Sequence, residues 1–229
     1  MSGALQAIVF DFDGVIADSE PLHLRAYQQA LAQEGIELTA EDYYGCYLGY
    51  DDVGMLQAVA QDRGVAWSER RIAELVSRKG AKLQTLLQAD SVLFPGARDF
   101  IREAAVAVPI AIASGALRHE IDEIIEATGL ADLFSAIVAS GDTPQSKPAP
   151  APYLLAFERL RAVTGDLDSR RCVAIEDSRW GLESARRAGL RCVGVTNSYP
   201  AHELPGAELV VGGLKELTLP MLERLVADA

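Results

Sequence analysis

Short apolar runs rich in valine and isoleucine recur along the chain, and each predicts a β-strand. They cover Ala7–Phe10, Val108–Ala113, Ala136–Ala139, Cys172–Ile175, Cys192–Val195 and Glu208–Val211. The runs are continuously apolar instead of alternating with polar positions, which is typical of parallel strands covered on both faces.

Segments with apolar residues at helical spacing lie between most of these runs. The predicted helices are Ala97–Ala105, Leu117–Thr128, Pro152–Arg161 and Arg179–Ala188, and Gly129 and Gly189 end two of them. Strands that alternate with helices predict an α/β fold with a doubly wound, Rossmann-like parallel sheet.

The interval after the first strand breaks this alternation, because it shows only helical patterns. Helices are predicted at Leu22–Gln33, Glu41–Cys46, Asp51–Arg63 and Ser68–Gln88, separated at Gly35, Gly49 and Gly64. Pro95–Gly96 marks the return to the sheet. We therefore expect residues 1–17 and 91–229 to form the sheet domain and residues 18–90 an inserted all-helical domain.

One lysine interrupts the apolar stripe of the last of these inserted helices. The stripe consists of Ile72, Leu75, Val76, Leu83, Leu86 and Leu87. At about 100° per residue, Lys79 lies between Leu75 and Val76 around the helix axis, so its side chain is aimed inward. Either the ammonium snorkels along the stripe to water, or it reaches toward an anionic substrate.

Composition and charge narrow the range of partners. Hydrophobic residues make up 49% of the 229 positions, which predicts a folded chain with a sizeable core. The 21 Lys+Arg against 33 Asp+Glu give a formal charge of -12, which repels nucleic acid and anionic lipid. We therefore expect neither nucleic acid nor a membrane as a partner, and the acidic surface permits a monomer.

The cysteines and the N-terminal residues bear on the compartment. Cys46, Cys172 and Cys192 form no C-x-x-C pair and are odd in number, so we expect buried thiols. Residues 1–14 lack the basic start and long apolar stretch of a signal peptide, and no run approaches the ~18 apolar residues that span a membrane. These features favour the cytoplasm.

Two carboxylates directly follow the first predicted strand, at the sheet edge where open α/β folds bind ligands. Asp11 and Asp13 point the same way if the extended conformation continues through them. Two close anions need a cation or a shared proton, and Mg²⁺ is the simplest candidate. Gly14 permits a tight turn and close approach of a ligand to the backbone. The alternative is an acidic turn without a ligand.

A second acidic pair, Glu176 and Asp177, follows the predicted strand Cys172–Ile175. The two pairs can converge on one ion, and hard oxygen ligands suit Mg²⁺, which usually keeps waters and takes a substrate phosphate. The alternative is that the second pair only caps the helix that begins near Arg179.

Ser114-Gly115 and Lys147 follow two further strands of the sheet. A hydroxyl beside backbone N–H groups and a fixed ammonium are what a phosphoryl oxygen needs as its charge redistributes. Taken singly, Ser114 could cap a helix and Lys147 could be a solvated loop residue. Because several strand ends each deliver such a group, the sequence predicts a metal-assisted phosphoryl site.

These motifs resemble the haloacid dehalogenase superfamily, in the branch of β-phosphoglucomutase-like and sugar-phosphate phosphatases. The resemblance rests on DFDGV at 11–15, the serine of IASG at 112–115, the lysine of SKPAP at 146–150 and IEDS at 175–178, all in family order. DSEPLH at 18–23 also resembles this branch. The resemblance covers nearly the whole sequence, and it implies a catalytic core with the helical insertion as its cap domain.

The resemblance also implies a role for each motif residue. Asp11 would be the nucleophile that forms an aspartyl-phosphate, and Asp13 the general acid and base. Mg²⁺ would be held by Asp11, the backbone carbonyl of Asp13, Asp177 and, directly or through water, Glu176. The phosphate-binding residues would be Gly14, Ser114, Gly115 and Lys147. The substrate implied is a small phosphorylated metabolite.

Other activities of the superfamily fit the residues less well. Dehalogenases and phosphonate hydrolases lack an acid two residues after the nucleophile, so Asp13 favours phosphoryl transfer. A β-phosphoglucomutase-type phosphomutase shares every core motif but presents a basic K-G-V-S-R-like cap segment where this chain has LGYDD at 48–52. An acid there would repel a distal phosphate, which favours a phosphatase. A non-catalytic phospho-binding module is a further alternative.

Candidate specificity residues come from the cap and from the rim of the core. They are His23, Gly49, Tyr50, Asp51, Asp52, Lys79 and Arg118. Three have structural alternatives: Tyr50 could pack on a cap helix, Arg118 could pair with Asp122, and His23 could lie on the surface.

Overall fold

The computed structural model describes residues 5–47, 50, 52–89 and 92–227. The chain divides into two compact units. Met1–Asp18 together with Leu93–Ala229 form the first, here called the sheet unit, and Ser19–Val92 form the second, here called the helical unit.

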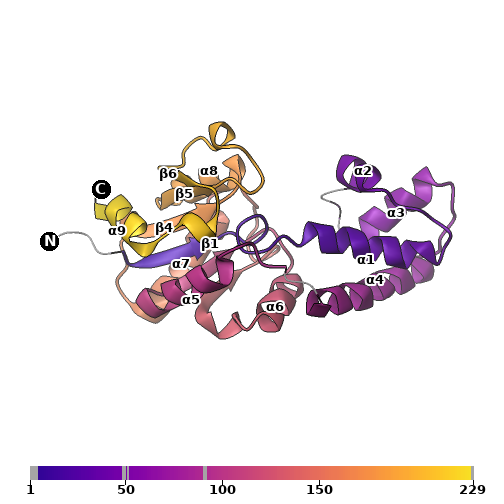
Figure 1. The fold of residues 1–229 in the computed structure, drawn as a ribbon, viewed down its shortest axis with the longest axis horizontal. Helices are drawn as coiled ribbons and strands as arrows, with labels where there is room; N and C mark the ends of the chain where they lie inside the picture. The colour runs from indigo at the N-terminus through magenta and orange to yellow at the C-terminus, as the bar shows by residue number, and fades with distance from the viewer. Residues whose placement is uncertain (1–4, 48–49, 51, 90–91, 228–229) are drawn as a thin grey trace. The chain divides into compact units, whose positions relative to one another are not determined.

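A six-stranded parallel sheet forms the centre of the sheet unit (Figure 1). Its strands are β1 (Ala7–Phe10), β2 (Ile110–Ala113), β3 (Phe134–Val138), β4 (Cys172–Glu176), β5 (Arg191–Val195) and β6 (Leu209–Val211). They lie in the order β3-β2-β1-β4-β5-β6, and every neighbouring pair is parallel. The predicted doubly wound, Rossmann-like sheet is confirmed, with β1 in its interior.

Helices connect the strands of the sheet unit. They are α5 (Ala97–Ala107), α6 (Arg118–Ala127), α7 (Ala151–Thr164), α8 (Arg179–Arg187) and α9 (Leu219–Ala227), with 3₁₀ turns at Ala131–Leu133, Ser169–Arg171, Ala201–Glu203 and Leu214–Glu216. Four of the five helices were predicted. The apolar pattern did not reveal α9, because its stripe is short and only Leu222 and Val226 are buried.

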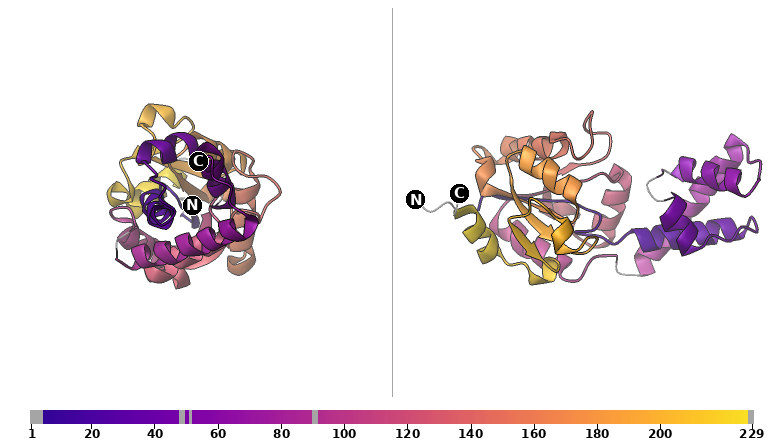
Figure 2. Two further views of the ribbon diagram at one scale, coloured as in Figure 1. Left: turned by 90° about the vertical axis from the view of Figure 1, so that its right-hand side faces the viewer. Right: turned by 90° about the horizontal axis from the view of Figure 1, so that it is seen from above.

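Both faces of the sheet are covered by helices (Figure 2), which explains why its strands are continuously apolar. On one face, Val9 of β1 belongs to a buried cluster with Tyr153 of α7 and Leu182 of α8. On the other face, Phe10 packs edge-on against Phe100 of α5, with ring centroids 6.2 Å apart. The alternation of side chains along β1 therefore serves two separate cores.

The helical unit consists of α1 (Glu20–Ala32), α2 (Ala40–Asp42), α3 (Asp52–Asp62) and α4 (Glu69–Ala89). Its core includes Tyr27 and Leu31 of α1, Leu56 of α3 and Leu75 of α4. None of the described residues of this unit lies in a strand, as the sequence predicts. Across all described residues, no helix has the length and apolarity needed to cross a membrane.

The helix expected at Glu41–Cys46 has a different form. It ends as α2 at Asp42, and Tyr43–Tyr47 continue as a wider π-helical turn. In this turn the rings of Tyr43 and Tyr47 are buried, while their hydroxyls donate to Glu20 (2.7 Å) and Asp62 (2.8 Å) respectively. At this site, the burial of two tyrosine rings whose hydroxyls keep hydrogen-bond partners stabilises the turn more than regular α-helical backbone hydrogen bonds would.

The three cysteines are free thiols, but only two are buried. Burial raises the pKa of Cys172 and of Cys192 to about 12. Cys46 is exposed, so the expectation of a buried thiol was wrong there. It lies on the exposed side of the π-helical turn with Tyr44 and Gly45, whereas Tyr43 and Tyr47 take the buried side.

The core of the helical unit yields a stability prediction. Leu56→Ala, at a fully buried position, should lower the free energy of unfolding of this unit by roughly 2–5 kcal/mol. The unit's own transition can be followed by the fluorescence of Trp67, which packs against this core, in a Trp180→Phe background that removes the other tryptophan. Leu154→Ala in α7, where Leu154 is 39% exposed, is the matched control and should leave the Trp67 transition unchanged.

Candidate active site

The carboxyl ends of adjacent strands bring the predicted motif residues together. Asp11 follows β1, and its N–H donates to the carbonyl of Ile175 in β4 (2.9 Å). Ser114 follows β2 and donates its N–H to the carbonyl of Val138 in β3 (2.9 Å). Because parallel neighbouring strands end at one edge, four loops open onto the same place.

Three buried carboxylates meet at this edge. Asp11, Glu176 and Asp177 each offer an oxygen, and these oxygens lie within 4.8 Å of one another. Asp11 and Asp177 are 8% and 7% exposed, and Glu176 is fully buried. The predicted convergence of the two acidic pairs thus holds for these three residues.

Lys147 links two of the three carboxylates. Its Nζ lies 2.6 Å from Oδ1 of Asp11 and 2.6 Å from Oε1 of Glu176. The same ammonium lies over the ring of Tyr153, 5.0 Å from the centroid. One ammonium against three carboxylates leaves an excess of negative charge in a buried place.

Burial and this excess of negative charge together shift the pKa values of Asp11, Asp177 and Lys147. Burial, together with the charge of Glu176, raises the pKa of Asp11 well above its ordinary value, although Lys147 opposes the rise. Burial also raises the pKa of Asp177 to about 6, against the hydrogen bond from Ser198. Burial lowers the pKa of Lys147, but the charges of Asp11 and Glu176 outweigh it and raise that pKa above its ordinary value.

Glu176 is held by donors on both oxygens. Its Oε1 accepts from Tyr153 Oη (2.8 Å) as well as from Lys147, and its Oε2 accepts from the Asp177 N–H and the Ser178 hydroxyl (both 3.2 Å). Gly181 in α8 makes room for it, since a Cβ there would lie 1.8 Å from Glu176 Oε1. Ser178, whose Oγ accepts from the Gly181 N–H, supplies the cap of α8, so the acidic pair does more than cap this helix.

The chain turns sharply after Asp11. Phe12 lies in a bend, so the extended conformation does not continue and the condition for parallel side chains at Asp11 and Asp13 is not met. Asp13 is half-buried, and its carboxylate is not one of the three that cluster. Gly14 has φ +81°, and a Cβ there would lie 1.8 Å from Asp177 Oδ2, so only glycine fits this turn.

Ser114 and Gly115 form the tight turn between β2 and α6. Ser114 is buried at 4% exposure, and its Oγ accepts from the Ala116 N–H (3.0 Å). Gly115 is exposed, and nothing lies within 4 Å of the place of a Cβ. The hydroxyl thus lies next to the backbone N–H of Ala116 in this turn.

Several residues of this site were not predicted from the sequence. Tyr153 and Gly181 hold Glu176, while Asn197 and Ser198, which follow β5, contact Gly14 and Asp177. The position of Asn197 and Ser198 after a parallel strand is a signal that could have found them. Nothing in the sequence singles out Tyr153, whose apolar ring fits a core helix equally well.

The donor set fits Mg²⁺. Its members are hard carboxylate oxygens, they are buried, and their negative charge exceeds that of the single nearby cation. Burial and the charge of Glu176 raise the pKa values of Asp11 and Asp177, and a divalent cation bound here would counter both effects.

A second polar cluster lies in the helical unit. Lys79 is 2% exposed, and its Nζ lies 2.8 Å from Asp52 Oδ1 and 3.1 Å from His23 Nδ1. Its ammonium also lies over the ring of Tyr27, 5.0 Å from the centroid. The inward aim of Lys79 is confirmed and snorkelling to water is wrong, because Asp52 and His23 give the ammonium polar partners inside. Burial opposes ionisation of Asp52, but Lys79 outweighs it and lowers the Asp52 pKa.

The remaining candidate residues are spread over the two units. Tyr50 is 57% exposed, and Gly49 and Asp51 lie outside the described residues. Arg118 pairs with Asp122, its Nε 2.9 Å from both carboxylate oxygens, as the structural alternative expects.

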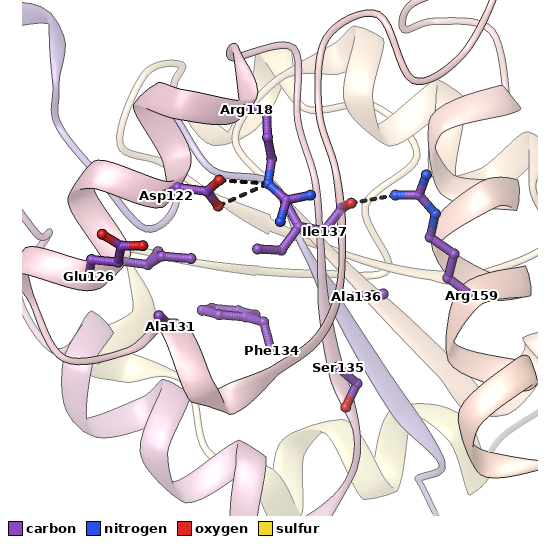
Figure 3. Close-up of a pocket in the computed structure, with 10 residues that line it drawn as sticks. Arg118, Asp122, Glu126, Ala131, Phe134, Ser135, Ala136, Ile137 and Arg159 are labelled. Carbon is purple, nitrogen blue, oxygen red and sulfur yellow. Dashed lines mark hydrogen bonds and ion pairs between the residues drawn. The ribbon is translucent and has the colours of Figure 1, made fainter.

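Arg118 also lines a pocket of about 430 Å³ beside the edge strand β3. Figure 3 shows Arg118 and Asp122 of α6 on one side of it and Arg159 of α7 on the other. Arg159 donates to the Ile137 carbonyl of β3 (2.5 Å) and pairs with Asp142, so it covers part of the open sheet edge. The lining contains none of the three clustered carboxylates.

Comparisons with known proteins show what this chain is similar to. A model of the haloacid dehalogenase-like hydrolases matches residues 5–189. Protein CbbY from Rhodobacter capsulatus is 33% identical over 202 residues, 85% of this chain and 87% of that protein. Phosphoglycolate phosphatase from Cereibacter sphaeroides is 32% identical over 206 residues, 88% and 91% of the two chains. The crystal structure of an Asp-to-Asn variant of CbbY from Rhodobacter sphaeroides with xylulose-(1,5)bisphosphate has a TM-score of 0.73 at 28% identity, covering 93% of this chain and 96% of that one.

The raised pKa of Asp177 predicts how the metal-free protein responds to pH. Between its ordinary value of 3.8 and about 6, Asp177 is protonated in the folded protein and ionised in the unfolded chain. The folded state then binds more protons, so its stability should fall as pH rises through this window, by on the order of 3 kcal/mol.

The measurement is the free energy of unfolding in urea with EDTA, from pH 4 to pH 7, for the native protein and Asp177→Asn. The variant should lose this part of the pH dependence, and Mg²⁺ should weaken it in the native protein. An identical pH slope in the two proteins would contradict the prediction.

Proposed function

Because the chain belongs to the haloacid dehalogenase-like hydrolases, we propose that it is a Mg²⁺-dependent phosphatase of small phosphate monoesters. The observation that carries this proposal is the contact of Lys147 with both Asp11 and Glu176, beside Asp177. It joins a nucleophilic carboxylate, a fixed cation and acidic metal donors at one edge of the sheet. The name of the phosphoglycolate phosphatase relative supports the same reaction class.

We assign the attack on phosphorus to Asp11. Lys147 holds its Oδ1 at 2.6 Å, so the carboxylate is oriented before substrate arrives. A bond forms between a carboxylate oxygen and phosphorus while the ester P–O bond breaks, which gives an aspartyl-phosphate and the free alcohol. Water then displaces the carboxylate, which regenerates Asp11 and releases inorganic phosphate.

Asp13 is the proposed general acid and base. It gives a proton to the leaving alcohol oxygen in the first step and takes one from the attacking water in the second. Its place outside the three-carboxylate cluster supports a role separate from metal binding by its side chain.

Lys147 and Ser114 are the proposed partners of the phosphoryl oxygens. Lys147 stays protonated because Asp11 and Glu176 favour its charged form, so it can offset negative charge on the phosphate. Ser114 lies in the turn after β2. Gly14 and Gly115, in the turns after β1 and β2, have no Cβ that would hinder the approach of a ligand to the backbone.

The residues that would hold Mg²⁺ are Asp11, Asp177, the backbone carbonyl of Asp13 and Glu176. Bound Mg²⁺ would offset the repulsion between the phosphate and the carboxylates. Lys147 alone cannot do so, because its single charge faces both Asp11 and Glu176.

We propose a sugar phosphate as the substrate class, since the CbbY relative was crystallised with xylulose-(1,5)bisphosphate. The helical unit would act as the cap that selects the substrate, with His23, Tyr50, Asp52 and Lys79 as its candidate specificity residues. A phosphomutase would need a cationic partner for a second phosphate. The pairing of Lys79 with Asp52 argues against that role for this lysine.

Asp11→Asn should abolish turnover, because the amide keeps the volume of the side chain but is not a nucleophile. The measurement is release of inorganic phosphate from a panel of monoesters with Mg²⁺ or EDTA, including phosphoglycolate and xylulose 1,5-bisphosphate. Native activity should require Mg²⁺, and the variant should keep its far-ultraviolet circular dichroism. Substantial turnover by the variant would refute the assignment of Asp11 as the nucleophile.

The same panel tests the alternatives. Conversion of β-glucose 1-phosphate to glucose 6-phosphate without phosphate release would establish a mutase. No reaction with any ester would favour a phospho-binding module instead.

Asp13→Asn should slow hydrolysis of alkyl phosphates much more than that of aryl phosphates with acidic leaving groups. An activated leaving oxygen needs little protonation, so loss of the acid slows hydrolysis of the aryl ester less. For the alkyl ester we expect the rate to fall by roughly 10²–10⁴-fold, the usual contribution of general acid catalysis. The measurement is kcat/KM for one ester of each kind, at equal Mg²⁺. Equal losses on both esters would refute the acid role of Asp13.

A further inference from the structure

The loop that follows β5, residues 196–199, is anchored at both ends within the sheet unit. The Thr196 N–H donates to the carbonyl of Val211 in β6 (3.1 Å). At the other end, Tyr199 packs against the buried cluster of α7 and α8, and its ring meets that of Trp180 edge-on at 6.1 Å. The two residues between these anchors therefore have little freedom to move.

Both of these residues donate hydrogen bonds to the candidate active site. Asn197 Nδ2 donates to the carbonyl of Gly14 (2.7 Å), across 183 positions of the sequence. Ser198 Oγ donates to Oδ2 of Asp177, across 21 positions. One contact thus reaches the turn after β1 and the other a clustered carboxylate after β4.

The three segments leave no room for a side chain at Gly14. A Cβ on Gly14 would lie 1.8 Å from Asp177 Oδ2 and 2.9 Å from Ser198 Oγ. The turn at Gly14, the Asp177 carboxylate and the Ser198 hydroxyl therefore pack against one another, so movement of one displaces the others.

We propose that Ser198 and Asn197 are positioning residues that set the geometry of the metal-binding oxygens. This inference rests on the proposed function, because it assigns the two residues to the Mg²⁺ site of that reaction. A hydrogen bond to Oδ2 of Asp177 fixes the rotation of the carboxylate and hence the direction of Oδ1. A hydrogen bond to the Gly14 carbonyl fixes the turn that carries the Asp13 carbonyl, one residue earlier.

The chemical kind of these two donors suits this role. A hydroxyl and an amide orient an oxygen but carry no charge, so they leave the negative charge of the cluster for a cation. Lys147 does the opposite, because its ammonium offsets that charge as it binds Asp11 and Glu176. In this site, uncharged side chains orient the metal-binding oxygens, and the Lys147 ammonium offsets part of their negative charge.

Ser198→Ala should weaken Mg²⁺ binding roughly tenfold, as is usual when a partner of a metal ligand is removed. The measurement is isothermal titration of the metal-free protein with MgCl₂, without substrate. Ser198→Thr keeps the hydroxyl and should restore native affinity. Asn197→Ala tests the second contact and should also weaken binding. Ser135→Ala, at an exposed position on β3, is the matched control and should bind like the native protein.

Two further readouts separate positioning from a general structural role. Thermal midpoints of Ser198→Ala and Ser135→Ala should agree, because Ser198 is exposed. In phosphate release, Ser198→Ala should need more Mg²⁺ for half-maximal rate, while kcat at saturating Mg²⁺ stays close to the native value.

Native affinity in Ser198→Ala, with binding lost in Asp177→Asn, would overturn this inference and leave the proposed function standing. A native protein that binds no Mg²⁺ would overturn both. A uniform fall in kcat at every Mg²⁺ concentration, with unchanged affinity, would also refute the positioning role.

Discussion

The ammonium of Lys147 is the contact on which the rest of the active site depends. Three carboxylates buried at one sheet edge repel one another, and burial without partners is costly for each charge. Lys147 bridges Asp11 and Glu176 at 2.6 Å each, which stabilises the group but leaves negative charge in excess. That remaining negative charge attracts a divalent cation, which would in turn offset the repulsion between a phosphate and the carboxylates. A site balanced completely by its own lysines would have no affinity left for Mg²⁺.

The order of the strands makes this contact possible. Because β1 lies between β2 and β4, the loops that carry Asp11, Ser114 and Glu176 leave the sheet side by side. The lysine comes from the segment after β3 and reaches the same edge. The helical insertion enters after β1 and returns before α5, so it leaves the hydrogen bonding of the sheet intact.

Close packing, besides charge, shapes the site. Gly14 and Gly181 are two positions where a Cβ would lie 1.8 Å from a carboxylate oxygen, of Asp177 and Glu176 respectively. Each glycine lets backbone approach an acidic side chain that must be buried and oriented at once. A carboxylate held in so narrow a space keeps one orientation, and a metal ligand needs a fixed orientation.

The sequence by itself determined the sheet, most helices and the motif residues Asp11, Ser114, Lys147 and Glu176-Asp177. Apolar runs and helical spacing are local patterns, and strand ends follow directly from them. Only the tertiary structure decided the partners of these groups. The contact of Asn197 with Gly14 spans 183 positions and that of Tyr153 with Glu176 spans 23, and neither leaves a periodic trace. Periodicity aimed Lys79 inward, but only the tertiary structure gave its partners Asp52 and His23, and only the tertiary structure exposed the thiol of Cys46. A side chain's neighbours depend on how distant segments pack, and periodicity along the chain reports only which face of its own element it occupies.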